Sequence, residues 1–592
     1  MSAAPVKVST TSIFPTIPRA QTNKDFQVLL RVEAPPVADL KGHFPIDVVA
    51  VLDVSGSMGD PAMASSDSET KPPSRLDALK EAMRFIIRKL DDGDRLSIVA
   101  FNDGPVKEYS TSLLDISGNG RRIAEKKVDW LEARGGTEIM PALEEAIRVL
   151  DSRSGDSRNR VGFIILLTDG DDTSGFRWSR EVIHGAVSKY PVHTFGLGAA
   201  HNSEALLYIA QESRGTYSFV DDENLDKIAG ALAVCLGGLK TVAAVGTRVS
   251  VKVAELSGAR IERIDSGGYE SHVACGGASS EVVIGVLYAG EVKSFLIHLH
   301  VPAASVSSLD CGYCDAATVC DHHGHHCHRR HDQRLLDIGY SYRSSPDAAE
   351  ISIGGRGVFV QRPEEETFVV SDNGGRQVLL PSPMVLQHIV RFELLEIVAG
   401  FFESEIIILE KTTTKQLHGN VLQRKWEEFR RARQFWGGVE LDGIEKEVDA
   451  MVSSLRRGLT YVSSWVSSHQ MQRATAMGSP EKVAAEFITP AMASMVEEAQ
   501  RMPPPTSAKN PGYDLQDMIG QRLELWSKVR REVPLMYQAS PEEEEHQQVT
   551  AVFREASLEA IDRAMHRDVY LAVVHASKRK RCDGHRDPAP GK

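Results

Sequence analysis

The stretch DVVAVLDVSGSMGD, residues 47–60, decides how the first half of this chain is interpreted. Residues 48–52 are all apolar, and a short apolar run rich in valine predicts a strand buried on both faces of a sheet. The run ends abruptly in Asp53, Ser55 and Ser57, which alternate with Val54 and Gly56. A carboxylate and two hydroxyls at the tip of a buried strand require a structural or chemical explanation.

Strands and helices alternate around this stretch, over residues 44–240. Ser74 begins a predicted helix as its N-cap, and Asp77 follows three residues later, as in a capping box with Asp in place of Glu. Further strands are predicted at 95–101, 161–168, 192–197 and 216–220, with helices between them. Repeated βα units predict an α/β doubly wound sheet with helices on both faces.

Three segments reach the carboxyl edge of the predicted sheet, where ligands bind in doubly wound folds. The first is Asp53-x-Ser55-x-Ser57, the second is the loop GGT that ends in Thr137, and the third is Asp169 in LLTDGDD. Their hydroxyl and carboxylate oxygens are hard donors that suit Mg²⁺, which takes about six oxygens. A DxSxS pattern alone also occurs as a polar turn, but three such segments in this order favour a metal site.

The motifs DVSGS, GGT and TDG together resemble the metal-ion-dependent adhesion site of von Willebrand factor type A domains. In that family such residues surround Mg²⁺ or Mn²⁺, and an acidic side chain of a partner protein completes the shell. The resemblance covers residues 44–240 and implies that the metal site consists of Asp53, Ser55, Ser57, Thr137 and Asp169.

The resemblance extends further along the chain. LSIVAFND, LLTDGDDT and SSWVSSHQMQRATA (residues 463–476) resemble plant type A proteins that share a layout with inter-α-trypsin-inhibitor heavy chains. Among these, the chain is similar to the wavy-growth group of RING ubiquitin ligases, which carry a RING before the type A domain. This sequence has no cysteine before Cys235, so the RING is missing and ubiquitin transfer is not expected of it.

The rest of the chain divides by composition. Alternating runs rich in Val, Ile and Phe predict an antiparallel β-sandwich over 241–380, joined by N-terminal strands from 1–43. Helical periodicity predicts an α-helical region over 381–501, which the resemblance assigns to the C-terminal region of plant type A proteins. A proline-rich hinge at 502–512 and C-terminal helices with a basic tail at 513–592 follow.

A segment rich in cysteine and histidine, residues 311–331, interrupts the predicted sandwich. Four thiols, one pair of them at CxxC spacing, suit a tetrahedral Zn²⁺ site. An insertion that binds metal only adventitiously explains the same composition, and the sequence leaves both interpretations open. The candidate zinc ligands are Cys311, Cys314, Cys320 and Cys327.

Charge and N-terminal composition favour some cellular compartments and some classes of binding partner over others. The net charge of −13 argues against nucleic acid or an anionic membrane as the main partner. The N-terminal residues lack the basic and apolar blocks of a signal peptide, so a cytoplasmic protein is expected. The basic run KRKR at 578–581 leaves the nucleus as the alternative.

The sequence favours a non-enzymatic interaction protein. It contains no GxSxG elbow, phosphate-binding loop or HExxH motif. The resemblance implies an adaptor whose metal captures an Asp or Glu side chain of a protein partner. The alternative is a RING-less accessory subunit of a plant ubiquitin ligase that works with RING-containing relatives. The C-terminal helices offer a surface for homo- or heterodimerisation.

Overall fold

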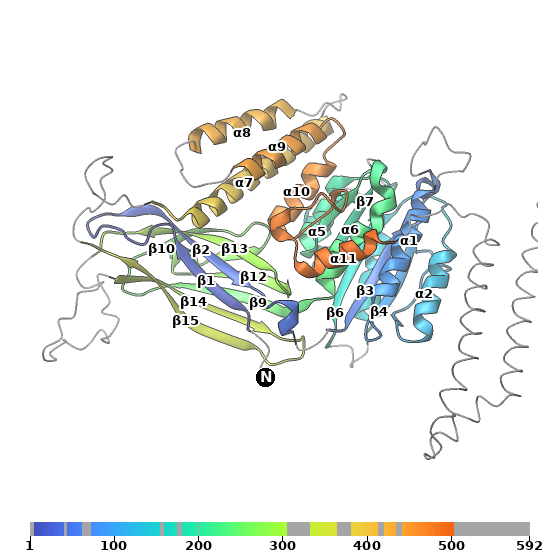
Figure 1. Ribbon diagram of the computed structural model, residues 1–592, viewed down its shortest axis with the longest axis horizontal. Coiled ribbons are helices and arrows are strands. Elements are labelled where there is room, and N and C mark those ends of the chain that lie inside the picture. Colours follow the sequence, from blue (N-terminus) through green and yellow to red (C-terminus); the bar gives the residue numbers. More distant parts are fainter. Residues whose placement is uncertain are drawn as a thin grey trace, which may run out of the picture. The chain divides into compact units, whose positions relative to one another are not determined.

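The computed structural model describes residues 5–40, 44–61, 73–153, 159–174, 180–198, 200–304, 332–363, 380–411, 419–433 and 441–502. The segment with the candidate zinc ligands, 311–331, lies outside the described residues, and so do residues 503–592 with the predicted C-terminal helices and basic tail. The described residues form three β-sheets with helices packed around them (Figure 1).

The first sheet has seven strands and confirms the predicted α/β fold. All its neighbouring strands pair in parallel except β5, which is antiparallel to β4. In order across the sheet the strands are β16 (Met477–Gly478), β8 (Tyr217–Val220), β7 (Val192–Leu197), β6 (Val161–Thr168), β3 (Ile46–Asp53), β4 (Arg95–Phe101) and β5 (Leu114–Asp115).

Strand β3 is buried along its whole length because β4 and β6 pair with it on either side. Val48 and Leu52 face one layer of helices, whereas Val49 and Val51 face the other, so successive side chains serve opposite faces. The first layer consists of α1 (Arg75–Lys89), α2 (Asn119–Asp129) and α6 (Ile228–Leu239). The second consists of α3 (Ile139–Asp151), α4 (Arg180–Val187) and α5 (Ser203–Ser213).

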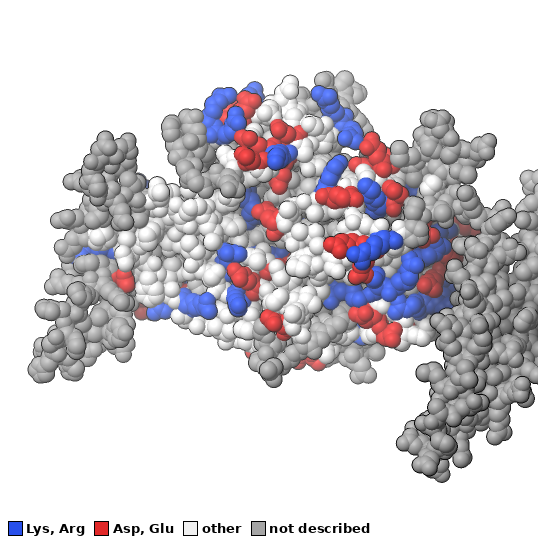
Figure 2. Space-filling model, viewed as in Figure 1, with Lys and Arg blue, Asp and Glu red and all other residues white. Residues whose placement is uncertain are grey.

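The remaining two sheets are antiparallel and share an apolar core, as the predicted β-sandwich requires. One contains β1 (Lys7–Ser12), β2 (Asn23–Glu33), β13 (Val292–Val301) and β10 (Arg260–Asp265). The other contains β11 (Glu270–Val273), β12 (Ser279–Tyr288), β9 (Val242–Val253), β14 (Asp332–Arg343) and β15 (Ile351–Gln361). On the face shown in Figure 2 the strands of the sandwich carry few charges, whereas acidic and basic side chains are interspersed over the helices.

The C-terminal region contains helices, as predicted, but it also contributes strand β16 to the edge of the seven-stranded sheet. The helices are α7 (Pro383–Lys411), α8 (Gly419–Arg433), α9 (Asp442–Ser454), α10 (Thr460–Met471) and α11 (Pro490–Gln500). None of the helices in the described ranges has the length and apolar character needed to cross a membrane.

Helix α11 packs closely on α6, which is buried on nearly every side. Gly237 and Gly238 of α6 permit this approach. A Cβ atom at Gly237 would lie 2.7 Å from the Cα atom of Met492, and one at Gly238 would lie 2.8 Å from the ring of Tyr288. The first neighbour belongs to α11 and the second to the sandwich strand β12, so α6 contacts both at once.

The segment SSWVSSHQMQRATA connects the sheets through buried polar contacts. The backbone N–H of Tyr217 in β8 donates to the Ser467 hydroxyl at 2.8 Å. Arg473 donates to the Glu291 carboxylate at 2.8 Å and to the Val286 carbonyl at 2.6 Å. This segment therefore links the seven-stranded sheet to the sandwich.

Glu291, Lys293 and Arg473 form a charged cluster that is almost completely buried. Burial opposes ionisation of Glu291, but the charges of Arg473 and Lys293 outweigh it and lower the pKa of this carboxyl. Burial lowers the pKa of Lys293 to about 7, against the opposing effect of Glu291. Arg473 is therefore the main fixed counter-charge of Glu291.

We expect Arg473→Met to lower the stability of the protein strongly, because it leaves Glu291 buried with an incomplete partner. Removing one member of a buried ion pair typically costs about 3–5 kcal/mol. Urea unfolding followed by circular dichroism should show a clearly lower midpoint. Arg501→Met is the matched control, since that side chain is 75% exposed. Equal midpoints for the two variants would contradict the importance of the buried cluster.

Candidate metal centre

The parallel register of β3 and β6 brings two of the predicted segments together. Leu52 pairs with Leu167, so Asp53 and Thr168 lie next to each other at the carboxyl edge, and Asp169 follows directly. Two of the three predicted segments therefore meet at neighbouring strand ends.

The GGT loop is attached to the same edge by backbone hydrogen bonds. The N–H of Gly56 donates to the carbonyl of Gly135 at 3.0 Å, and the N–H of Arg134 donates to the carbonyl of Val54 at 2.7 Å. Thr137, two residues later, is 3% exposed. The structure thus gathers all five predicted residues at one edge of the sheet.

Short hydrogen bonds join the polar side chains there. The Oδ2 atom of Asp53 accepts from the Thr168 hydroxyl at 2.6 Å, and its Oδ1 atom accepts from the Ser55 N–H at 2.7 Å. The Ser57 hydroxyl donates to Oδ1 of Asp169 at 2.7 Å and lies 3.1 Å from the Ser55 hydroxyl. The two serines and the two carboxylates therefore form one connected group.

Gly170 leaves space for the third hydroxyl. A Cβ atom at this position would lie 3.4 Å from Oγ1 of Thr137 and 3.7 Å from Oγ of Ser57. Both hydroxyls thus border the same small volume, beside Asp169. Hydroxyl oxygens from Ser57 and Thr137 converge although their segments are 80 positions apart.

The electrostatics of the group favour a cation. Burial raises the pKa of Asp53 to about 6; hydrogen bonds from Thr168 and Ser55 oppose this rise, and the charge of Asp169 adds to it. Two buried carboxylates this close repel each other unless positive charge is added. Hard oxygen donors together with two buried carboxylates fit Mg²⁺ or Mn²⁺.

Hydroxyl ligands are essential to this interpretation. Within the part of the chain that the structure describes, no group of three or more His, Cys, Asp or Glu side chains could hold a metal ion. The candidate centre combines two carboxylates with three hydroxyls instead. The four candidate zinc ligands, Cys311, Cys314, Cys320 and Cys327, lie outside the described residues.

Several residues that support the site were not identified from the sequence. Thr173 holds the backbone of Thr137: its hydroxyl accepts from the Thr137 N–H at 2.8 Å, and its own N–H donates to the Thr137 carbonyl at 2.8 Å. Asp103 accepts from the N–H of Gly136 at 2.9 Å. Thr168 and Thr173 lie within LLTDGDDT, but nothing in that pattern indicates which of its hydroxyls hold other loops.

Arg75 was also missed. Its Nη1 atom donates to Oδ2 of Asp169 at 2.9 Å, and its Nη2 atom donates to Oδ1 of Asp222 at 3.1 Å. The guanidinium thus lies directly beside the candidate metal centre. An arginine at the start of a helix carries no sequence signal for such a contact, because its partners follow strands far along the chain.

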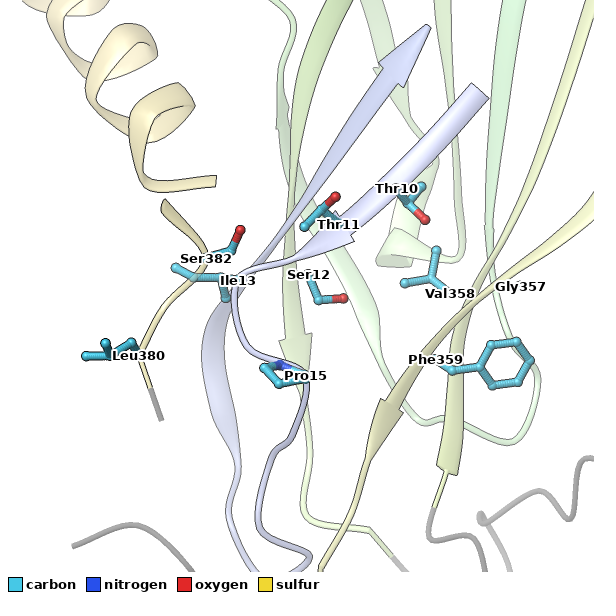
Figure 3. A pocket seen from close by; sticks show the side chains of 10 residues that line it. All are labelled: Thr10, Thr11, Ser12, Ile13, Pro15, Gly357, Val358, Phe359, Leu380 and Ser382. Carbon is cyan, nitrogen blue, oxygen red and sulfur yellow. The ribbon is translucent and has the colours of Figure 1, made fainter. Parts of the chain in front are cut away.

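A pocket of about 450 Å³ lies elsewhere, between the edge strands β1 and β15 of the sandwich (Figure 3). Hydroxyls and apolar side chains line it, and none of the lining residues is titratable. It therefore offers neither acid–base groups nor charged metal ligands. The lining residues are Thr10, Thr11, Ser12, Ile13, Pro15, Gly357, Val358, Phe359, Leu380 and Ser382.

Comparison with known proteins agrees with the geometry of the strand edge. The family model of the von Willebrand factor type A domain matches residues 46–219. These residues form a type A domain. The chain is also similar in fold to a von Willebrand factor type A protein from Catenulispora acidiphila, with a TM-score of 0.50 at 18% identity, over 76% of this chain and 89% of that one.

Curated relatives resemble this chain over part of their length. The "E3 ubiquitin-protein ligase WAV3" of Arabidopsis thaliana is 31% identical over 297 residues, which are 47% of this chain and 35% of that protein. "Inter-alpha-trypsin inhibitor heavy chain H4" of Homo sapiens is 30% identical over 161 residues, 26% of this chain and 16% of that protein. The predicted resemblance to plant type A proteins with a heavy-chain-like layout is confirmed.

The functions of type A domains in general bear on the role of this strand edge. Type A domains often carry a divalent-metal site that mediates protein interactions, and they are generally not enzymes. In this chain two aspartates, two serines and one threonine lie together at the carboxyl edge of the type A sheet. Their hydroxyl and carboxylate oxygens are donors of the kind that a divalent cation accepts.

We expect Thr173→Val to weaken Mg²⁺ binding, because the Thr137 N–H loses its acceptor and only the backbone bond from Thr173 to the Thr137 carbonyl still holds this loop. Residues that support metal ligands typically contribute about 10–100-fold in affinity. Titration calorimetry with MgCl₂ measures the effect. Thr111→Val is the matched control, because the Thr111 hydroxyl likewise accepts a backbone hydrogen bond, from Ile98. A Thr173→Val variant that binds Mg²⁺ as well as this control would contradict the supporting role.

Proposed function

We propose that this protein is a non-enzymatic adaptor that captures an acidic side chain of a protein partner through a divalent metal ion in its type A domain. The observation that carries the proposal is the convergence of three polar segments on one buried strand edge. The proposed metal site consists of Asp53, Ser55, Ser57, Thr137 and Asp169.

The hydrogen bonds suggest a division of roles among these residues. Both oxygens of Asp53 already accept hydrogen bonds, so this carboxylate supplies charge and orients its neighbours. The hydroxyls of Ser55, Ser57 and Thr137 are the neutral oxygens available to a metal. Neutral ligands leave a bound divalent cation under-neutralised, and the cation then attracts a further carboxylate from outside. This charge imbalance is why we expect an Asp or Glu on the partner.

We propose Mg²⁺ as the ion, with Mn²⁺ as the alternative. Hydroxyl and carboxylate oxygens are hard donors, which both ions accept. The choice between the two ions depends on their concentrations as well as on the site.

The surroundings of the site support a binding role rather than hydrolysis. His201 is close enough to Arg75 and Asp222 for their charges to influence its pKa. Its Nδ1 atom is bonded to the carbonyl of Gly198 and its Nε2 atom to the hydroxyl of Tyr217. Burial lowers the pKa of His201 to about 4. This histidine therefore has no free nitrogen with which to activate a metal-bound water.

A second candidate function is that of an accessory subunit in a plant ubiquitin ligase complex. The similarity to "E3 ubiquitin-protein ligase WAV3" over 297 residues favours it. In this version the helices near the C-terminus pair with a RING-containing relative or with a second copy, in the cytoplasm or the nucleus. Co-purification with such a relative from plant tissue would favour this function over a separate adaptor role.

We expect Asp53→Ala to abolish Mg²⁺ binding while the fold is retained, because Asp53 lies at a strand tip and its loss opens no large cavity. Wild-type protein should gain about 2.7 kcal/mol of stability at a hundredfold excess of Mg²⁺ over Kd. Thermal unfolding with and without MgCl₂, and with EDTA, measures this gain. Asp92→Ala, with a side chain that is 85% exposed, should keep the gain. A full Mg²⁺-dependent shift in Asp53→Ala would place the metal elsewhere.

We expect this 592-residue chain to lack ubiquitin-transfer activity of its own, because its sequence has no cysteine before Cys235 from which an N-terminal RING could be built. An assay with activating enzyme, conjugating enzyme and ubiquitin should yield no polyubiquitin chains. A RING-containing plant relative assayed in parallel is the positive control. Polyubiquitin formed with this protein as the only candidate ligase would contradict the proposal of a non-enzymatic adaptor.

A further inference from the structure

Arg75 bridges the ends of two strands beside the candidate metal centre. It donates to Asp169, which follows β6, at 2.9 Å and to Asp222, which lies just beyond β8, at 3.1 Å. The side chain of Asp169 is 0% exposed, that of Arg75 is 16% exposed and that of Asp222 is 44% exposed. The stronger electrostatic interaction is therefore the buried one, with the carboxylate of the candidate metal centre.

Two features of the fold position the guanidinium: the capped start of α1 and the space beside Gly198. Ser74 and Asp77 form a complete capping box, which fixes the first turn of α1 where Arg75 begins the helix. Gly198, just after β7, has a φ of +73° and lies next to the contact between Arg75 and Asp222. A Cβ atom there would be 2.4 Å from Oδ1 of Asp222 and 3.1 Å from Nη2 of Arg75. The absence of a side chain at this position is what lets the arginine cross from β6 to β8.

The two carboxylate oxygens of Asp169 have different hydrogen-bond partners. Its Oδ1 atom accepts from the Ser57 hydroxyl, and its Oδ2 atom accepts from Arg75. Asp53 is buried nearby, and the two carboxylates repel each other. Arg75 therefore supplies positive charge to a pair of buried carboxylates before any metal arrives.

We propose that Arg75 is a resident counter-ion of the metal centre: it stabilises the metal-free type A domain and thereby limits the affinity of the centre for divalent cations. This inference rests on the proposed metal-binding function. Arg75 is a positioning residue, because it acts through Asp169 and is not itself a metal ligand.

Removing Arg75 has two opposite effects on metal affinity, and the larger one decides whether the affinity rises or falls. Loss of the guanidinium loosens Asp169, which alone would weaken metal binding. Asp169 keeps its hydrogen bond to Ser57, so this loss is partial. Loss of a positive charge within the site also removes repulsion against a doubly charged ion and leaves two carboxylates without compensation. In a partly buried site the charge effect is the larger, and tighter metal binding is the result.

The test uses the full chain and the substitution Arg75→Gln. Thermal unfolding in EDTA should show a lower midpoint than the wild type. Titration calorimetry with MgCl₂ should show a Kd at least about tenfold lower than that of the wild type. Arg75→Lys keeps the charge and should return both values towards those of the wild type. A purely structural role for Arg75 predicts the opposite change in Kd.

Arg84→Gln is the matched control, because Arg84 lies on the same helix and pairs with Glu81 and Asp129, which are not part of the metal centre. It should leave the Kd unchanged. An unchanged or higher Kd for Arg75→Gln would overturn the counter-ion role while leaving the proposed metal site intact. Absence of Mg²⁺ binding by the wild type would overturn both proposals, so the two failures are distinguishable.

A second variant covers the case in which Arg75→Gln does not fold. Adding Asp169→Asn removes the carboxylate that Arg75 compensates, so the double variant should recover a folded metal-free state. Recovery, measured by the unfolding midpoint in EDTA, supports the counter-ion role. A double variant that stays unfolded would overturn it, because Arg75 would then be needed for a reason other than the charge of Asp169.

Discussion

The hydrogen bond from Thr168 to Asp53 is the interaction on which the candidate metal centre depends. It joins the ends of β3 and β6 at 2.6 Å, in a place where both side chains are fully buried. It can form only because the two strands run in parallel and in register up to Leu52 and Leu167. Because hydrogen bonds hold both of its oxygens, the Asp53 carboxylate cannot rotate without breaking them. The surrounding hydroxyls and Arg75 must therefore adapt to it.

Much of this arrangement was accessible from the sequence, because it follows from periodicity and strand direction. The apolar run of β3 indicated a strand with two buried faces, and its side chains do alternate between the two helical layers. The convergence of Asp53, Thr137 and Asp169 followed from the rule that ligands bind beyond the carboxyl ends of parallel strands. These inferences needed only the order of elements, which a sequence contains.

The unpredicted residues act through contacts between distant parts of the chain. Arg75 meets Asp169 and Asp222 only once β6 and β8 have been placed, and Thr173 holds Thr137 only once two loops have met. Strand β16 has two residues, too few to show a period of its own. Its position depends on β8, to which it adds in parallel. Patterns within a segment do not contain this information.

The packing of α6 determines how far the type A domain can be separated from the rest of the chain. A domain that folds independently of its neighbours normally has its own hydrophobic core. Here Gly237 and Gly238 fit α6 against Met492 of a later helix and Tyr288 of the sandwich, and β16 completes a sheet that began about 430 residues earlier. Residues 46–219 alone lack α6, so their transfer into another protein would expose the sheet face that α6 covers and the edge of β8 that pairs with β16. The type A domain of this chain therefore depends on the sandwich and on the helices that follow it to bury its surface.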